Sequence, residues 1–358
     1  MSMRSVARAA VAAGLALVVA GCGSASPAAT GAPAAGTPTA SASSAPAASS
    51  LVTSVTPTAS SPATSPATAP TPAPFVVAAT APGPALKQLW QIGGPKPPKD
   101  GGCCPTVAPD GNLWVSSEYD ATFWIIGPNG KYLGSWGAPG TGNGQFNFAG
   151  TGGAYGDITF DPDGTFYVAD TGNHRIQKFD TNRHFVKAWG SFGTDDGQFA
   201  NPAWVVSDGQ GHIYVADTDR LDVQEFNSDG TYVRTVASDT NVQFMVADSK
   251  GHVYVGDGPT IRVYDANGHQ LPGFDLSSTG AYVGGMAIDA AGHLFIPTIS
   301  SYNLPITTEP IYELDGSGKV LHAWPGDADS IALDPKGGAL YTSFFSEPFI
   351  RKLELPKP

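Results

Sequence analysis

The sequence predicts an all-β fold of six similar four-stranded units that close into a propeller. A turn glycine between two apolar runs recurs at positions separated by 53, 47, 40, 41 and 45 residues: Gly111, Gly164, Gly211, Gly251, Gly292 and Gly337. A period of about 40–50 residues with short strands is typical of propellers rather than of helical solenoids. The 44 Gly and 31 Pro residues suit many tight turns, and few segments have the pattern of a long amphipathic helix.

Residues 157–189 show the repeated unit most clearly. A first strand at 157–161 runs into Asp161-Pro162-Asp163-Gly164, whose residue types favour a tight turn. Further strands are expected at 165–170, 175–180 and 184–189, with a loop at 171–174. Each unit is therefore expected to form one antiparallel blade.

This unit resembles the NHL repeat. The stretch YVADTGNHRIQKFD at 167–180 carries the resemblance, and GNGQF at 142–146 and DGQF at 196–199 are similar to the element between such repeats. The next two units keep YVADTD at 214–219 and YVGD at 254–257, and the other three diverge. The resemblance covers residues 85–358 and implies an NHL-type six-bladed β-propeller, a fold that serves many functions.

The sixth unit ends without a fourth strand of its own. Trp136, Trp189 and Trp324 end the fourth strands of units one, two and five, whereas unit six stops at Leu353-Glu354-Leu355. Lys87-Gln88-Leu89-Trp90 supplies the missing pattern at the other end of the domain. We therefore expect the N-terminal strand to complete the last blade and remove an open sheet edge.

The first residues have the pattern of a secretory signal peptide. Arg4 and Arg8 precede an apolar run at 9–20 that is too short to span a membrane. The run ends at Val19-Ala20-Gly21-Cys22, which resembles the lipobox of bacterial lipoproteins. This resemblance implies cleavage after residue 21 and acyl chains on Cys22, which becomes the mature N-terminus and anchors the chain. The alternative is an ordinary signal peptide followed by a chance cysteine.

Residues 22–84 are expected to be a disordered tether, because Ala, Pro, Ser, Thr and Gly dominate and no charge occurs between Arg8 and Lys87. Three segments follow: a signal peptide at 1–21, the lipidated cysteine with its tether at 22–84, and the propeller at 85–358. The expected location is extracytoplasmic, anchored in a cell membrane and facing the cell surface or the periplasm.

The charge balance excludes some partners. The chain has 19 basic and 31 acidic residues, and Arg4 and Arg8 are the only charges before the expected domain. An acidic domain of this kind argues against nucleic-acid binding and against contact with an anionic membrane except through the lipid anchor.

Binding residues are expected on one face, where the loops between second and third strands meet the linkers into the first strands. Aromatic and acidic side chains occur there, which would suit a cationic, sugar-like or peptide ligand. The alternative is that they are ordinary residues at the blade ends. The candidates are Asp157, Trp204, Phe244, Glu118, Asp170, Asp217, Arg220, Phe344 and Phe345.

Asp170 and Arg175 have a second interpretation, because the family resemblance implies an ion pair that orders the loop between blades. His212, His252 and His293 each follow a turn glycine in consecutive units. Such repeat-equivalent positions lie on different blades, too far apart to share one zinc ion. We expect neither a metal nor a cofactor.

Cys103 and Cys104 are adjacent and are the only thiols left if Cys22 is acylated. An oxidising compartment favours a disulfide between them, but neighbouring α-carbons about 3.8 Å apart would strain it. A vicinal disulfide and two free thiols both remain open.

The sequence thus favours a non-enzymatic binding, sensor or scaffold module for a protein, a peptide or a cell-envelope glycan. The alternative is a lyase or hydrolase with a site at the mouth of the central channel. Propeller-type peptidyl-amidating lyases, which this fold resembles, use converging histidines, and no such set can be assembled from His174, His184 and His322. No phosphate-binding loop or nucleophile motif stands out either.

Overall fold

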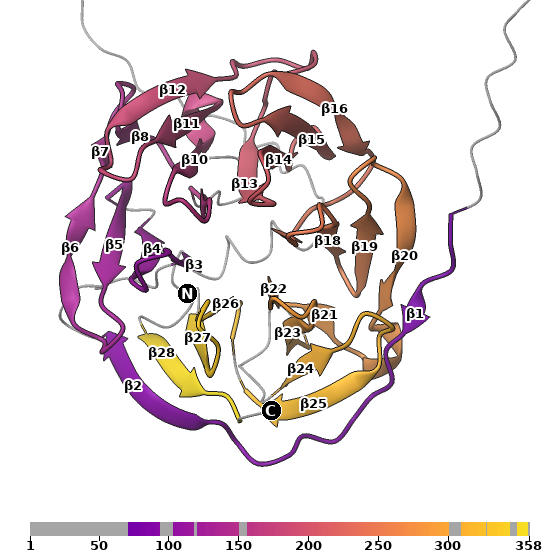
Figure 1. The fold of residues 1–358 in the computed structure, drawn as a ribbon. Helices are drawn as coiled ribbons and strands as arrows, with labels where there is room; N and C mark the ends of the chain where they lie inside the picture. The colour runs from indigo at the N-terminus through magenta and orange to yellow at the C-terminus, as the bar shows by residue number, and fades with distance from the viewer. Residues whose placement is uncertain are drawn as a thin grey trace, which may run out of the picture. The chain divides into compact units, whose positions relative to one another are not determined.

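The computed structural model describes residues 71–93, 103–117, 120–149, 156–300, 309–326, 328–343 and 349–356. Six twisted sheets surround a central axis, as Figure 1 shows. Among the described residues, helical structure is limited to the single turns η1 (Thr171–Asn173) and η2 (Ser277–Thr279). The all-β, six-bladed prediction is confirmed.

Each blade is an antiparallel sheet whose strands follow one another outward from the axis (Figure 1). Blade 1 contains β3 (Cys103–Val107), β4 (Leu113–Ser117), β5 (Thr122–Ile126) and β6 (Tyr132–Trp136). Blade 2 contains β9 (Ile158–Phe160), β10 (Phe166–Asp170), β11 (Arg175–Phe179) and β12 (Phe185–Trp189). Blade 3 contains β13 (Pro202–Ser207), β14 (His212–Asp217), β15 (Asp222–Asn227) and β16 (Tyr232–Ala237).

Blades 4 to 6 deviate slightly from this pattern. Blade 4 contains β17 (Phe244–Ala247), β18 (Val253–Asp257), β19 (Thr260–Tyr264) and β20 (Gln270–Asp275), with β1 (Phe75–Val76) added at its edge. Blade 5 has an interrupted inner strand, β21 (Tyr282–Val283) and β22 (Ala287–Ile288), followed by β23 (Leu294–Ile299), β24 (Pro310–Leu314) and β25 (Val320–Pro325). Blade 6 contains β26 (Ser330–Leu333), β27 (Ala339–Ser343), β28 (Phe349–Glu354) and β2 (Lys87–Gly93).

Aspartate and glycine shape the tight turns. In blade 4, the carboxylate of Asp248 accepts hydrogen bonds from the backbone N–H groups of Lys250 and His252, both at 2.9 Å. Gly251 has a φ of +80°, a left-handed conformation that glycine adopts without steric cost. The recurrence of these two residue types is therefore explained by backbone geometry.

The N-terminal strand closes the ring, as predicted. β2 pairs antiparallel with β28, from Lys87 opposite Glu354 to Gly93 opposite Phe349. Trp90 lies over Gly130 of blade 1, and its indole Nε1 donates a 3.0 Å hydrogen bond to the Pro128 carbonyl. Trp189 and Gly230 form the same type of contact between blades 2 and 3, so the closing strand reproduces an ordinary blade interface.

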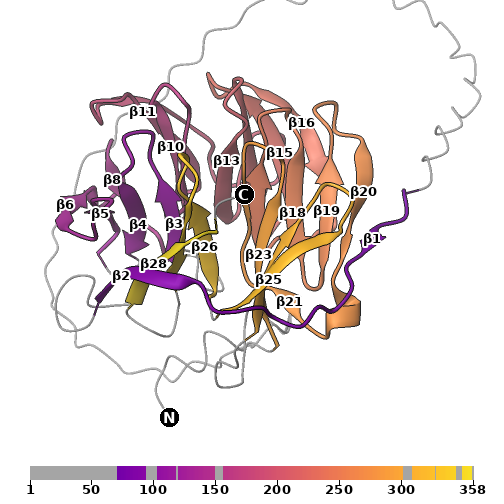
Figure 2. The same ribbon diagram turned by 60° about the horizontal axis from the view of Figure 1, so that its bottom comes forward.

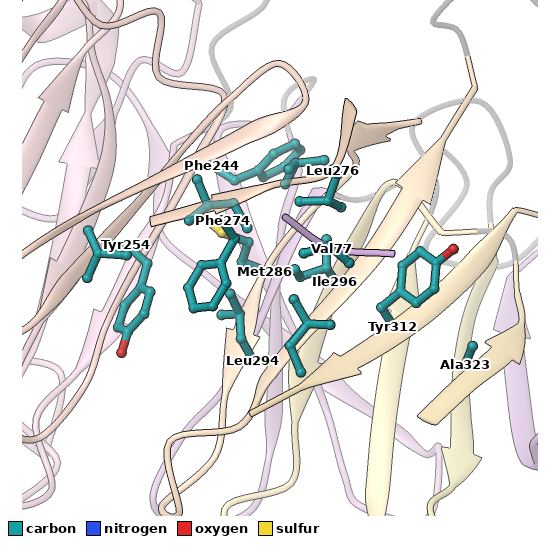
Figure 3. Close-up of a cluster of buried hydrophobic side chains, with 14 residues drawn as sticks. Val77, Phe244, Tyr254, Phe274, Leu276, Met286, Leu294, Ile296, Tyr312 and Ala323 are labelled. Atoms are coloured by element: carbon teal, nitrogen blue, oxygen red, sulfur yellow. The ribbon is translucent and has the colours of Figure 1, made fainter. Parts of the chain in front are cut away.

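The ordered domain begins before residue 85, which corrects the expected boundary. β1 pairs in parallel with β20, and Figures 1 and 2 show the indigo segment following the outside of the ring from β1 to β2. Val77 is fully buried among side chains of blades 4 and 5 (Figure 3), and the Gly83 N–H donates to the Ala323 carbonyl at 2.8 Å. Phe75, the first aromatic residue of the chain, was the available sequence signal.

Apolar clusters join neighbouring blades. Between blades 1 and 2, Trp136 packs edge-on against Phe179, with ring centroids 4.8 Å apart. Between blades 4 and 5, Tyr254 and Phe274 of blade 4 join Ile296 and Tyr312 of blade 5 in one buried cluster (Figure 3). This packing gives the loops a rigid base, and the functional residues must be sought at the blade ends.

Candidate functional site

Two faces can be distinguished at the ends of the blades. The loops after the second strands, at 171–174 and 218–221, meet the linker between blades 2 and 3 at 190–201, and we call this side the loop face. The aspartate–glycine turns lie at the opposite ends of the same strands, and we call that side the turn face. The sequence placed the candidate site on the loop face.

Equivalent positions recur at the start of the innermost strands. In each blade, a turn joins the first strand to the second, and in blade 2 this turn begins at Asp161. The residue four positions before the start of this turn is equivalent in all six blades: Cys104, Asp157, Trp204, Phe244, Gly285 and Ser330. Asp157 is the only charged member of this set, which we call the inner ring. The inner ring includes three of the predicted ligand-facing residues, Asp157, Trp204 and Phe244, which occupy equivalent positions in their blades.

Asp157 is a buried carboxylic acid, with 7% of its surface exposed. Its Oδ2 accepts a 3.0 Å hydrogen bond from the backbone N–H of Val205 in the next blade. Burial raises the pKa of Asp157 from its ordinary value of 3.8 to about 7, and the Val205 and Ile158 N–H groups offset only part of that rise. This carboxyl group therefore changes charge near neutral pH.

We expect Asp157 to make the folded protein less stable as the pH rises from about 4 to about 7. Within that window the native state binds more protons than the unfolded chain, so each step up in pH favours unfolding. The penalty is absent below the window and reaches a few kcal/mol, to order of magnitude, above it. Asp157→Asn should therefore raise the urea midpoint at pH 8 and leave it unchanged at pH 4. An equal effect at both pH values would contradict this assignment.

Trp204 and Phe244, the inner-ring residues of blades 3 and 4, pack against each other, with ring centroids 5.1 Å apart. Phe244 is buried and Trp204 is half-buried, because both contribute to the apolar clusters between blades. These two rings therefore do not form an open aromatic surface around the axis.

Asp170 is a buried acceptor for several donors. Its carboxylate accepts hydrogen bonds from Arg175 Nε at 2.7 Å and Gln177 Nε2 at 2.9 Å. The backbone N–H of Asn147 and the side-chain amide of Asn173 supply further donors at 2.8–3.0 Å. The contacts fit the structural ion pair that the family resemblance implied, so Asp170 leaves the set of ligand-facing candidates.

Blade 3 reaches a similar arrangement with different residues. Asp217 accepts backbone N–H bonds from Ala200 and Asn201, and from Arg220 at 3.0 Å. The Arg220 guanidinium instead pairs with Asp222, with Nη2 2.8 Å from Oδ2. Asp217 and Arg220 thus hold the loop together, and they too leave the ligand-facing set, because their side chains are used inside the fold.

Several predictions fall partly or wholly outside the described residues. The residues concerned are Glu118, Phe344, Phe345 and the lipidation candidate Cys22. The side chain of Cys103 also lies outside the described part of the structure. Cys104 is disulfide-bonded. Its pairing with Cys103 remains a prediction.

The loop face carries exposed apolar side chains that the sequence analysis did not identify. Phe192, in the linker between blades 2 and 3, is 72% exposed, and its ring lies edge-on to His174, with centroids 4.9 Å apart. Leu221, in the loop after β14, is 40% exposed. We call these three residues the rim patch. The only sequence signal was a second phenylalanine, besides Phe199, in this linker.

The rim patch stands on ordered loops. Phe192 forms a parallel β-bridge with the buried Phe199, and Arg220 donates from Nη1 to the Gly193 carbonyl at 3.4 Å. His174 and Leu221 both have left-handed backbones, with φ of +55° and +58°. Residues other than glycine seldom adopt this conformation, and it fixes the direction in which each side chain projects.

Histidines on the turn face pair within their own blades. The Nδ1 atom of each histidine lies near the Oδ2 atom of the aspartate four residues before it. The distances are 2.7 Å for His212 and Asp208, 2.9 Å for His252 and Asp248, and 3.2 Å for His293 and Asp289. Within the described ranges, no group of three His, Cys, Asp or Glu side chains is close enough to hold a metal ion. The same part of the chain contains no helix long and apolar enough to cross a membrane.

Six antiparallel sheets around one axis, closed by the N-terminal strand, define a six-bladed β-propeller. The family model of the NHL repeat matches residues 156–179, which include β9 to β11 and the loop ordered by Asp170. The chain is therefore a six-bladed propeller that carries the NHL repeat. No curated protein matches it.

Proposed function

We propose that this propeller is an extracytoplasmic, lipid-anchored binding module that docks a protein or peptide on its loop face. The exposure of Phe192 within the rim patch carries the proposal. Large aromatic side chains that project from ordered loops are frequent anchors of protein interfaces. NHL propellers also commonly serve as protein-interaction modules, which agrees with this use of the fold.

The surroundings of the patch indicate what kind of partner fits. Asp195 and Asp196 are exposed in the same linker as Phe192. The whole chain carries a net charge of −12, which attracts positively charged partners over a distance. The favoured partner therefore offers a pocket for the phenyl ring with Lys or Arg residues beside it.

Site-specific photocrosslinking in the native host tests the proposal. A photoreactive phenylalanine analogue at position 192 is expected to give a covalent adduct with one protein, identified by mass spectrometry. The control is the same analogue at Val186, which is 53% exposed on the outer strand β12. No adduct at position 192, or the same adducts from both positions, would count against docking through the rim patch. Crosslinking to glycan alone would identify the other partner class.

The anchor is tested separately. Because Cys22 follows the apolar run and the small residues 19–21, Cys22→Ala is expected to move the protein from the membrane fraction to the soluble fraction. Phase partitioning measures this shift, and the mass of the N-terminal peptide shows whether acyl chains are attached. An unmodified cysteine in the wild-type protein would refute the lipoprotein assignment.

Asp157 favours a second candidate function, a lyase or hydrolase acting at the inner ring. A carboxyl group with a pKa of about 7 suits general acid–base catalysis. Among the described residues, however, its assigned hydrogen-bond partners are backbone N–H groups, without a basic side chain or metal. The binding module therefore accounts for more of the structure.

A further inference from the structure

A pocket of about 340 Å³ opens on the turn face between blades 4 and 5, opposite the loop face. Its walls include Phe75 of β1, Val263, Leu271, Pro272 and Phe274 of blade 4, and Gly316 of blade 5. The volume lies at the lower end of the range for small-molecule sites, about 300–1,000 Å³. The rings of Phe75 and Phe274, 6.0 Å apart, make one side aromatic.

The pocket exists because blade 4 lacks a long basic side chain that blades 2 and 3 possess. In blade 3, Arg234 pairs with Glu225 and reaches the next blade, where Nη1 donates to the Asn267 carbonyl at 2.5 Å. In blade 2, Lys187 occupies the place of Arg234 and bonds the Asp229 carbonyl in the same manner. In blade 4, Pro272 stands at this place.

The acidic partner of this basic side chain is also replaced by an apolar residue in blade 4. Val263 of blade 4 stands where blade 3 has Glu225, because each lies five residues before the glycine of the turn between the third and fourth strands, Gly268 and Gly230. An ion pair that fills the groove between blades 3 and 4 is thus replaced by two small apolar residues between blades 4 and 5. The space left is apolar and suits a hydrocarbon or aromatic group.

The polar groups at the pocket determine the charge of its ligand. Asp248 is already satisfied by two backbone N–H groups, by Nδ1 of His252 at 2.9 Å and by the Tyr254 hydroxyl at 3.4 Å. Lys250 is exposed, and among the described residues its ammonium group has no ion pair or hydrogen bond. His252 is charged only when protonated, so Lys250 supplies the permanent unpaired charge.

We propose that this pocket binds a small organic acid with an aromatic or branched apolar body. The body lies against Val263, Pro272 and Phe274, and the carboxylate faces the ammonium group of Lys250. Charge complementarity decides for an anion over an amine, because the nearby carboxylate of Asp248 is satisfied within the protein. This site is independent of the function proposed for the loop face.

Ligand-observed NMR and calorimetry with three matched probes test the proposal on the full-length protein. We expect 3-phenylpropionate to bind with a millimolar or lower Kd, and 3-phenylpropanol and 3-phenylpropylamine to bind about tenfold more weakly. Lys250→Gln, which installs the residue that blade 3 has at Gln210, should weaken binding of the acid about threefold to tenfold. Lys131→Gln, at an exposed turn of blade 1, is the control and should change nothing.

A second variant tests the space rather than the charge. Pro272→Arg introduces the blade 3 residue and should abolish binding by filling the pocket, with circular dichroism confirming that the variant folds. If this variant fails to fold, Lys250→Gln still decides the question. Equal binding of acid and amine, an unchanged Kd in Lys250→Gln, or no binding of the acid at millimolar concentration would each overturn the proposal.

Discussion

Deletion of residues 1–93 is expected to abolish cooperative folding of the propeller. The deletion removes β2, including Trp90 and Ile92, which pack on the buried core of blades 1 and 6. Loss of one large buried side chain alone costs about 3–5 kcal/mol, and domains are stable by about 5–15 kcal/mol in total. The deletion also leaves β28 as an exposed edge that invites aggregation. Urea unfolding followed by tryptophan fluorescence, together with size-exclusion chromatography, measures the result.

Two shorter deletions serve as controls. Removing residues 1–70 should leave the unfolding midpoint unchanged, because this segment consists of the expected signal peptide and most of the expected tether, whose Ala, Pro, Ser and Thr residues offer little apolar surface to bury. Removing residues 1–84 should cost about 2–3 kcal/mol through loss of the buried Val77 and of the β1 pairing. If the chain lacking residues 1–93 were as stable as the one lacking 1–84, ring closure by β2 would not stabilise the fold.

Asp170→Ala is expected to lower the free energy of unfolding by about 3–5 kcal/mol. Asp170 is fully buried, and its removal takes the carboxylate acceptor from Arg175 Nε and Gln177 Nε2, which leaves these two side chains with backbone carbonyl acceptors alone. Chemical denaturation of the purified variant measures this loss. The matched control is Asp257→Ala in blade 4, where the partly exposed pair with Arg262 should contribute less than about 1 kcal/mol.

The relative size of these two effects tests the role of Asp170 directly. A residue that only faces a ligand would leave stability almost unchanged when replaced. Equal, small losses in both variants would therefore return Asp170 to the ligand-facing candidates. A large loss confined to Asp170→Ala supports its role in ordering the loop between blades.

The sequence by itself determined the blade architecture, since it depends on local signals repeated along the chain. Aspartate and glycine at the turns and alternating apolar strands specify each blade, because a tight turn and a half-buried strand each need particular residue types. The missing fourth strand of unit six and the pattern at Lys87–Trp90 also predicted closure of the ring. The acidic composition likewise follows from counting residues alone.

Only the tertiary structure decided which side chains remain available at the surface. Asp170 and Phe192 both lie near the loop face, yet four donor groups enclose the first and the second is 72% exposed. Val77, in a segment expected to be disordered, is buried because blades 4 and 5 offer it a surface that no local pattern records. Burial and hydrogen bonding are sums over contacts between distant residues, and the fold must exist before they can be assigned.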